Sequence, residues 1–228
     1  MRRTTNTDEK FVVSLQQKLM RNLQTYKLFN IERMKKFIPW IVVLAVLALL
    51  AIWGVGCYNE MVTKEETVET SWGDVQTYYQ RRADLIPNLV NTVKGYAEHE
   101  NSTLQEVIEA RAKATQITID PTNATPEQLA AYQSAQGELS QALGRLMAIS
   151  EAYPDLKANS NFRDLQAQLE GTENRIATAR QNYNGAVKDF NTYVRRFPKN
   201  IIASMCGFEK KNYFEADTMA AKAPEVNF

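Results

Sequence analysis

The chain has 228 residues, of which 44% are hydrophobic and 23% charged, so it can fill the core of one or two domains and is no disordered tail. Its formal net charge is +1, but residues 1–36 carry nine basic and three acidic residues, while the part after position 57 carries 18 basic and 23 acidic ones. That later part lacks the basic surface that nucleic acids require, so we expect no nucleic-acid partner.

The basic segment 1–36 has two interpretations. Met34, followed by two lysines and an apolar run, is how a membrane protein ordinarily begins, and on this interpretation residues 1–33 are not native. If the segment is made, its apolar residues share one face of a basic amphipathic helix that suits an anionic membrane surface. Those apolar residues are Phe11, Val12, Leu15, Leu19 and Leu23.

Residues 37–57 are expected to form a transmembrane anchor. The twenty residues 37–56 carry no charge. At about 1.5 Å per residue a helix of that length matches a hydrocarbon core of about 30 Å. Six basic residues lie within twenty positions upstream and one lies within twenty positions downstream. The positive-inside rule therefore predicts a single-pass protein of the inner cell membrane, with a cytoplasmic N-terminus and residues 58–228 outside the cytoplasm.

Cys57 leaves a second possibility open at the end of this segment. Gly54-Val55-Gly56-Cys57 resembles a bacterial lipoprotein box, although Gly54 stands where leucine is usual. The apolar run is longer than the 7–15 residues of a signal-peptide core, which favours an uncleaved anchor. Lipidation of Cys57 is the alternative.

A seven-residue repeat begins after the anchor and indicates a long helix with a narrow buried seam. We expect a kink or break near residues 83–87, because Pro87 interrupts the helix ladder and Asp84 is able to cap a new start. The seam positions are Met61, Glu65, Val68, Trp72, Val75, Tyr79, Arg82, Ile86, Leu89, Val93 and Tyr96.

Three further helices are expected. Ser102 and Gln105 fit a capping box before a helix to about residue 115, with an extension of the previous helix as the alternative. Thr125 and Gln128 fit another box before a helix that ends near Pro154. The last long helix begins at 159 or 160, and Pro198 ends it. Its seam is Phe162, Leu165, Leu169, Thr172, Ile176, Ala179, Tyr183, Ala186, Phe190, Tyr193 and Phe197.

These patterns predict an all-α fold, since no strand pattern occurs in the sequence. We expect a single N-terminal transmembrane helix followed by an antiparallel, four-helix-type bundle over residues 58–228, with long first and last helices. From about residue 199 the chain is expected to become an irregular tail, whose aromatic residues Phe208, Tyr213 and Phe214 pack on the bundle.

Polar residues beside the seams are the candidate site. An acid and base pair is one interpretation, and a site for a ligand or partner is a second. Because Arg82 occupies a seam position and Glu173 flanks one, we favour an ion-pair network that fixes the register between the first and last helices. We assign no catalytic residue, and with one histidine, His99, and two cysteines we expect no metal or cofactor. The predicted structural network is Arg82, Asp84, Thr172, Glu173, Asn174 and Arg175.

Several ordered motifs make the chain from Met34 onward resemble the LemA family of bacterial membrane proteins. They include Tyr79-Gln80-Arg81-Arg82, Asp84-Leu85-Ile86-Pro87-Asn88-Leu89-Val90, Ala110-Arg111-Ala112, Glu151-Ala152-Tyr153-Pro154-Asp155-Leu156, Leu169-Glu170-Gly171-Thr172-Glu173-Asn174-Arg175-Ile176 and Phe197-Pro198. The resemblance implies one membrane anchor and a helical bundle, and it brings no established activity, cofactor or catalytic residue. Family members are often encoded near membrane zinc proteases, which implies a partnership in envelope quality control. Residues 1–33 lie outside the resemblance.

Three functions follow, in order of preference. The first is a non-enzymatic scaffold or adaptor for other envelope proteins, favoured by an anchor joined to a long helical surface. The second is a self-assembling structural protein, because heptads pair between chains as readily as within one. The third is a hydrolase, which has only the charged cluster in its favour.

Overall fold

The computed structural model describes residues 5–97, 99–121 and 123–215, with the side chains of residues 16–23 and of those from 37 onward. Every regular element in these ranges is a helix, which confirms the all-α prediction. The chain divides into two compact units, Met1–Gly56 and Cys57–Phe228, and helix α1 (Thr5–Lys94) contains residues of both.

The first unit is helical from Thr5 onward. From Phe37 the helix contains an 18-residue window of mean hydropathy 2.6, no part of which is buried within the protein. By length and composition this helix is able to cross a membrane. Of the predicted amphipathic face, Leu19 and Leu23 are exposed. The side chains of Phe11, Val12 and Leu15 lie outside the described ones.

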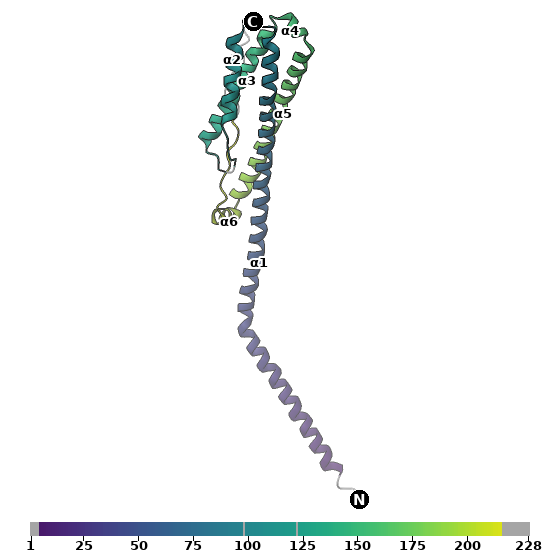
Figure 1. Ribbon diagram of the computed structural model, residues 1–228. Helices are drawn as coiled ribbons and strands as arrows, with labels where there is room; N and C mark the ends of the chain where they lie inside the picture. The colour runs from purple at the N-terminus through teal and green to yellow at the C-terminus, as the bar shows by residue number, and fades with distance from the viewer. Residues whose placement is uncertain (1–4, 98, 122, 216–228) are drawn as a thin grey trace, which may run out of the picture. The chain divides into compact units, whose positions relative to one another are not determined.

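The second unit is an antiparallel bundle (Figure 1). Ten residues separate Trp72 from Arg82 on α1, and their partners Tyr183 and Glu173 on α5 are ten residues apart in the opposite order, so the two helices run in opposite directions. The bundle helices after α1 are α2 (Asn101–Gln116), α3 (Pro126–Ser150), α4 (Pro154–Ala158), α5 (Ser160–Arg195) and α6 (Lys199–Cys206).

Local capping explains where two of these helices begin. Thr125 and Gln128 form the predicted capping box at the start of α3. Asn159 caps α5 by accepting a hydrogen bond from the backbone N–H of Phe162 at 3.0 Å. The predicted box of Ser102 and Gln105 is wrong, because α2 already begins at Asn101 with no side-chain cap and Ser102 lies inside it.

The predicted break near residues 83–87 is also wrong, since α1 is helical from Thr5 through Pro87 to Lys94. A proline inside a helix removes one backbone hydrogen bond, the one that its own nitrogen would donate to the carbonyl four residues earlier. In this chain that carbonyl belongs to Ala83, and a side chain from α2 supplies the missing donor.

The buried residues form two apolar clusters. The aromatic cluster is built around Trp72, Tyr79, Tyr132, Tyr183 and Phe214. The aliphatic cluster includes Ile86, Leu89, Val93, Leu104, Val107, Leu139, Leu146, Leu156, Phe162 and Leu169. Along α1, α3 and α5 the boundary between the two clusters falls at positions 82, 136 and 172, which are buried and polar or charged. A polar layer therefore separates two halves of the core.

The seams agree with the sequence over most of their length. Nine of the eleven positions of the first seam are buried; Glu65 is half-buried, and Tyr96, which follows the end of α1, is 43% exposed. On α5 the buried row includes Tyr183 but continues through Val187 and Val194, and Phe197 is 82% exposed. A straight helix repeats every 3.6 residues, so a strict seven-residue spacing leaves the buried face after several turns.

The irregular tail was expected from about residue 199, but Lys199–Cys206 form α6, and within that stretch the described chain is without helix only over residues 207–215. Two asparagines of α5 bind the backbone of this tail. Asn191 exchanges hydrogen bonds with the N–H and C=O of Lys211, both at 2.9 Å. Asn184 does the same with Phe214, at 2.9 and 3.0 Å. These bonds hold Phe214 against the aromatic cluster.

Candidate functional site

Arg82 is the centre of the polar layer. Its side chain is 1% exposed and bonds to two neighbouring helices. The Nη1 atom donates to Ser140 Oγ on α3 and to Glu173 Oε1 on α5, both at 2.7 Å. The Nη2 atom donates to Gln136 on α3, at 2.6 Å to Oε1 and at 3.3 Å to the backbone carbonyl. One guanidinium thus joins α1, α3 and α5.

Gln136 extends the same layer to a fourth helix, because its Nε2 donates to the carbonyl of Ala114 on α2 at 3.1 Å. The layer reaches solvent at Glu173, whose side chain is 41% exposed. We call Arg82, Gln136, Ser140 and Glu173 the Arg82 layer. The two terminal nitrogens of Arg82 are bonded, while its Nε is buried without a hydrogen-bond partner. A buried charge held in this way opposes any slip of one helix along another, because a slip would break these bonds.

The structure brings together only two of the six residues predicted for this network, Arg82 and Glu173. Thr172 is buried, but its hydroxyl donates to the carbonyl of Gln168 on its own helix at 2.7 Å. Asp84 is exposed and accepts a hydrogen bond from Gln80. Asn174 and Arg175 are exposed on α5.

Sequence reasoning missed Gln136 and Ser140. Their spacing of four residues, which places both on one face of α3, was the available signal. Polar residues four apart are also usual on exposed helix faces, so this signal alone does not distinguish a buried site from a solvated one.

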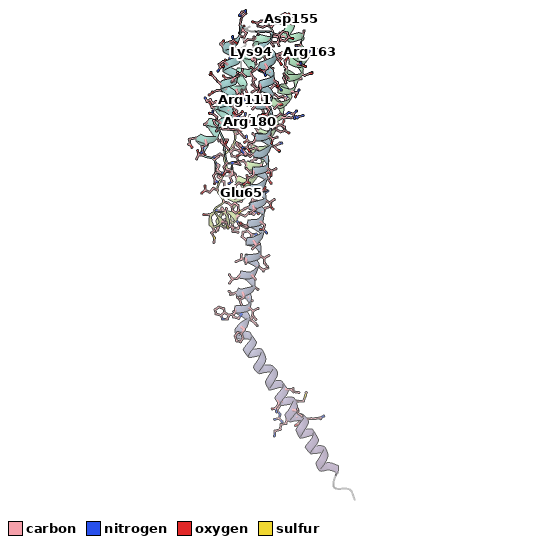
Figure 2. The ribbon with its side chains drawn as sticks, viewed as in Figure 1. Glu65, Lys94, Arg111, Asp155, Arg163 and Arg180 are labelled. Carbon is pink, nitrogen blue, oxygen red and sulfur yellow. The ribbon has the colours of Figure 1, made fainter. Side chains whose placement is uncertain are left out.

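A groove between α3 and α5 lies over the Arg82 layer. Arg180 on one wall donates through Nη2 to the carbonyl of Glu215 at 3.0 Å and lies 5.0 Å from the ring centre of Phe214. In Figure 2, Arg180 and Arg111 are labelled in the middle of the bundle. The residues that line the groove include Tyr79, Arg82, Gln133, Ser134, Glu138, Gln141, Glu173, Ile176, Arg180 and Glu215.

The groove combines fixed charges of both signs with a neutral phenol. Burial raises the pKa of Tyr79, although the guanidiniums of Arg180 and Arg82 oppose that shift. The phenol therefore stays protonated at neutral pH and is able to donate a hydrogen bond. Across the described residues, no three His, Cys, Asp or Glu side chains gather in a way that could hold a metal ion. These groups can bind polar or charged parts of a partner.

The two cysteines lie in different environments. Cys57 is 5% exposed within α1, and Cys206 is exposed in the last turn of α6; both are free thiols. His99 is exposed in the turn between α1 and α2, as expected of a surface turn.

Fold and site together define a class of protein: a helix able to cross a membrane, followed by an antiparallel helical bundle whose core is crossed by a buried arginine. The sequence model of the LemA family matches residues 71–228. The chain belongs to the LemA family, and the resemblance described from its motifs is confirmed.

Three proteins with sequences similar to this chain come from different bacteria. The chain is 30% identical over 175 residues to magnetosome protein MamQ 2 of Paramagnetospirillum magneticum, covering 69% of this chain and 64% of that protein. It is 28% identical to magnetosome protein MamQ of Magnetospirillum gryphiswaldense, with the same coverage. It is 25% identical to protein LemA of Metamycoplasma hominis, covering 71% of this chain and 70% of that protein. The match therefore spans about two thirds of each relative, just under that share for both MamQ proteins.

Proposed function

We propose that this protein is a membrane-tethered scaffold or adaptor of the bacterial cell envelope, working without catalysis, with its bundle outside the cytoplasm. The apolar stretch of α1 would hold the bundle at the bilayer. The partner class that we place first is a membrane zinc protease in envelope quality control, a choice that rests on the family resemblance alone.

The burial and the hydrogen bonds of Arg82 support the non-catalytic part of this proposal most directly. Its guanidinium is buried and bonded to three side chains of the same chain, and these contacts support a structural role for the charged cluster that favoured a hydrolase. The polar residues that remain accessible, such as Ser134, Glu138 and Gln141, lie along the groove. They suit contacts with another protein better than chemistry on a small substrate.

Self-assembly is less well supported by the structure than by the heptad pattern of the sequence. The α1 seam is buried inside one chain, against α5 and α3, so it offers little surface for pairing between chains. Self-assembly is therefore an outcome that the experiment must distinguish, and we do not propose it.

The experiment is site-specific photo-crosslinking of the full chain in its native membrane. A photoreactive residue replaces Ser134, which is exposed in the groove. The matched control replaces Asp164, which is exposed on α5 and does not line the groove. Crosslinked products are identified by mass spectrometry.

The proposal expects position 134 to crosslink to another membrane or envelope protein and position 164 to do so far less. Products that contain only two copies of this chain would support self-assembly instead. Equal products from both positions would show that the groove is not the contact surface.

A further inference from the structure

Helix α6 lies at the end of the bundle that contains Tyr58. The ring of Phe208, just after α6, packs edge-on against the ring of Tyr58, with 5.6 Å between centroids. The backbone N–H of Phe208 also donates to Ala203 of α6 at 3.0 Å. Tyr58 follows the last residue of the apolar run by two positions, so chain connectivity alone keeps it within about 7 Å of that residue.

One face of α6 and the turn before it are apolar and uncovered. Ile201 and Met205, four residues apart, share one face of α6 and are 52% and 81% exposed. Phe197, in the turn before the helix, is 82% exposed. Ile202 and Ala203 point to the bundle instead. We call Phe197, Ile201 and Met205 the α6 stripe.

Exposed basic residues outnumber acidic ones in the short segments that flank α6. Arg195, Arg196 and Lys210 are exposed there against one exposed acidic residue, Glu209, and α6 itself contains no acidic residue. Lys199, at the start of α6, places its Nζ 3.6 Å from the ring centre of Tyr193. Apolar residues flanked by arginine, lysine and aromatic rings are typical of a helix that lies in the interface of an anionic bilayer.

We infer that the α6 stripe binds the surface of the bilayer that α1 crosses, with its three apolar side chains among the lipid headgroups and its basic residues facing lipid phosphates. The inference rests on the proposed membrane anchoring. Its occupant is lipid, because the stripe lies at the end of the bundle that contains Tyr58, which is two residues from the apolar run in the sequence. A second bilayer contact of this kind would restrict rotation of the bundle about its anchor.

The test uses the full chain in vesicles of phosphatidylcholine and phosphatidylglycerol. Both native cysteines are replaced, by Cys57→Ser and Cys206→Ser, and nitroxide labels are attached to Ile201→Cys or Met205→Cys. The control label is Asp155→Cys, which is exposed. Figure 2 labels Asp155 and Glu65 toward opposite ends of the bundle, with Glu65 in the part of α1 nearer to α6.

Collision rates with oxygen and with a water-soluble nickel chelate report on each label's surroundings. We expect the labels at 201 and 205 to collide more often with oxygen, and the label at 155 to collide more often with the chelate. Water-like rates at 201 and 205, in a chain that floats with the vesicles, would overturn the inference and leave the anchoring intact. A chain that does not float with the vesicles would overturn both.

A second copy of the chain is the other possible cover for the stripe. Diluting labelled protein with an excess of unlabelled protein before reconstitution distinguishes the two, because a lipid contact leaves spin–spin broadening absent at every dilution. Broadening that disappears on dilution would assign the stripe to a second copy and overturn the lipid assignment.

Discussion

Arg111 on α2 donates from Nε to the backbone carbonyl of Ala83 on α1 at 2.7 Å, and this carbonyl is the one that Pro87 leaves without a helix donor. Ala83 is 2% exposed, so water has little access to replace that bond. A side chain from a neighbouring helix thus repairs the ladder at the proline and binds α2 to α1 at the same point.

Replacing Arg111 with methionine should therefore destabilise the bundle by about 1–3 kcal/mol, the usual cost of leaving a buried acceptor without a partner. The same change should cost less beside Pro87→Ala, because alanine restores the backbone donor to Ala83. Urea unfolding of the two single variants and the double variant measures this coupling. Strict additivity of the two changes would contradict the repair.

We expect substitutions of Arg82 and Glu173, the two charged residues of the Arg82 layer, to lower the free energy of unfolding by different amounts. Arg82→Met removes a buried cation but leaves Gln136 and Ser140 short of a donor, whereas Glu173→Leu leaves the buried cation without its carboxylate. Breaking a fully buried pair costs about 3–5 kcal/mol. Because Glu173 is 41% exposed, water replaces part of its bond and we expect the cost of Glu173→Leu to fall below that range.

The double variant Arg82→Met with Glu173→Leu should recover part of the stability lost in the singles, since neither charge is then left without the other. Unfolding free energies of all four proteins test this. If none of the substitutions changes stability, the layer does not hold the helices in register.

How much of this layer the sequence could reveal depends on the helix. Arg82 stood out because it interrupts an apolar seam, and Glu173 because it flanks one. Gln136 and Ser140 could not be recognised, because the burial of Gln136 and the approach of Ser140 to Arg82 depend on how α3 is rotated about its own axis in the bundle. The end of the α5 seam was misplaced for a related reason: Val194 and Phe197 both continue an apolar pattern, and only packing decides which is buried. The beginnings of α3 and α5 were predictable, since capping is decided by neighbouring residues in the chain.

Replacing Trp72 tests how much the aromatic cluster contributes to the stability of the bundle. It is 2% exposed, and its ring lies 5.4 to 5.6 Å from the rings of Tyr132, Tyr183 and Phe214. Trp72→Ala in the fragment 58–228, which we expect to be soluble and helical, should cost about 3–5 kcal/mol. Thermal unfolding followed by circular dichroism measures the loss. An unchanged melting temperature would mean that the cluster contributes little to stability.

Stability should also fall at high pH. Burial raises the pKa of Tyr183 from 10.0 to about 12, and burial raises that of Tyr132 as well. A raised pKa means that the folded state favours the neutral phenol, so this contribution is complete below pH 10 and is lost as the pH rises from 10 toward 12. Ionisation also removes the hydrogen bond from the Tyr183 hydroxyl to the carbonyl of Asn212 at 3.1 Å.

Melting temperatures measured between neutral pH and pH 12 test this trend. Tyr183→Phe, which cannot ionise, is the matched control and should show a shallower decline above pH 10. Parallel declines in the two proteins would mean that the titration of Tyr183 does not contribute.

The proposed orientation predicts that residue 134 faces away from the cytoplasm. A Ser134→Cys variant, in a background with Cys206→Ser, should react with a membrane-impermeant thiol reagent in intact cells, because position 134 is exposed on α3. The Cys206→Ser protein alone is the control, and it measures the background labelling of Cys57, which is buried. Protection in intact cells that disappears on lysis would reverse the orientation.

The two asparagines of α5 that bind the tail form hydrogen bonds with its main-chain atoms. Asn191 forms hydrogen bonds with the backbone N–H and C=O of Lys211, and Asn184 does so with those of Phe214. A neighbouring β-strand would satisfy the same backbone groups. These four hydrogen bonds place no demand on side chains, but burial does: Lys211 is 5% exposed and pairs with Glu65 at 2.6 Å, and Phe214 stacks on Trp72. Proline is also excluded at positions 211 and 214, because it has no N–H to offer. The attachment of the tail is thus encoded twice, by the two amides of α5 that fix its backbone and by two tail side chains that are buried in the bundle.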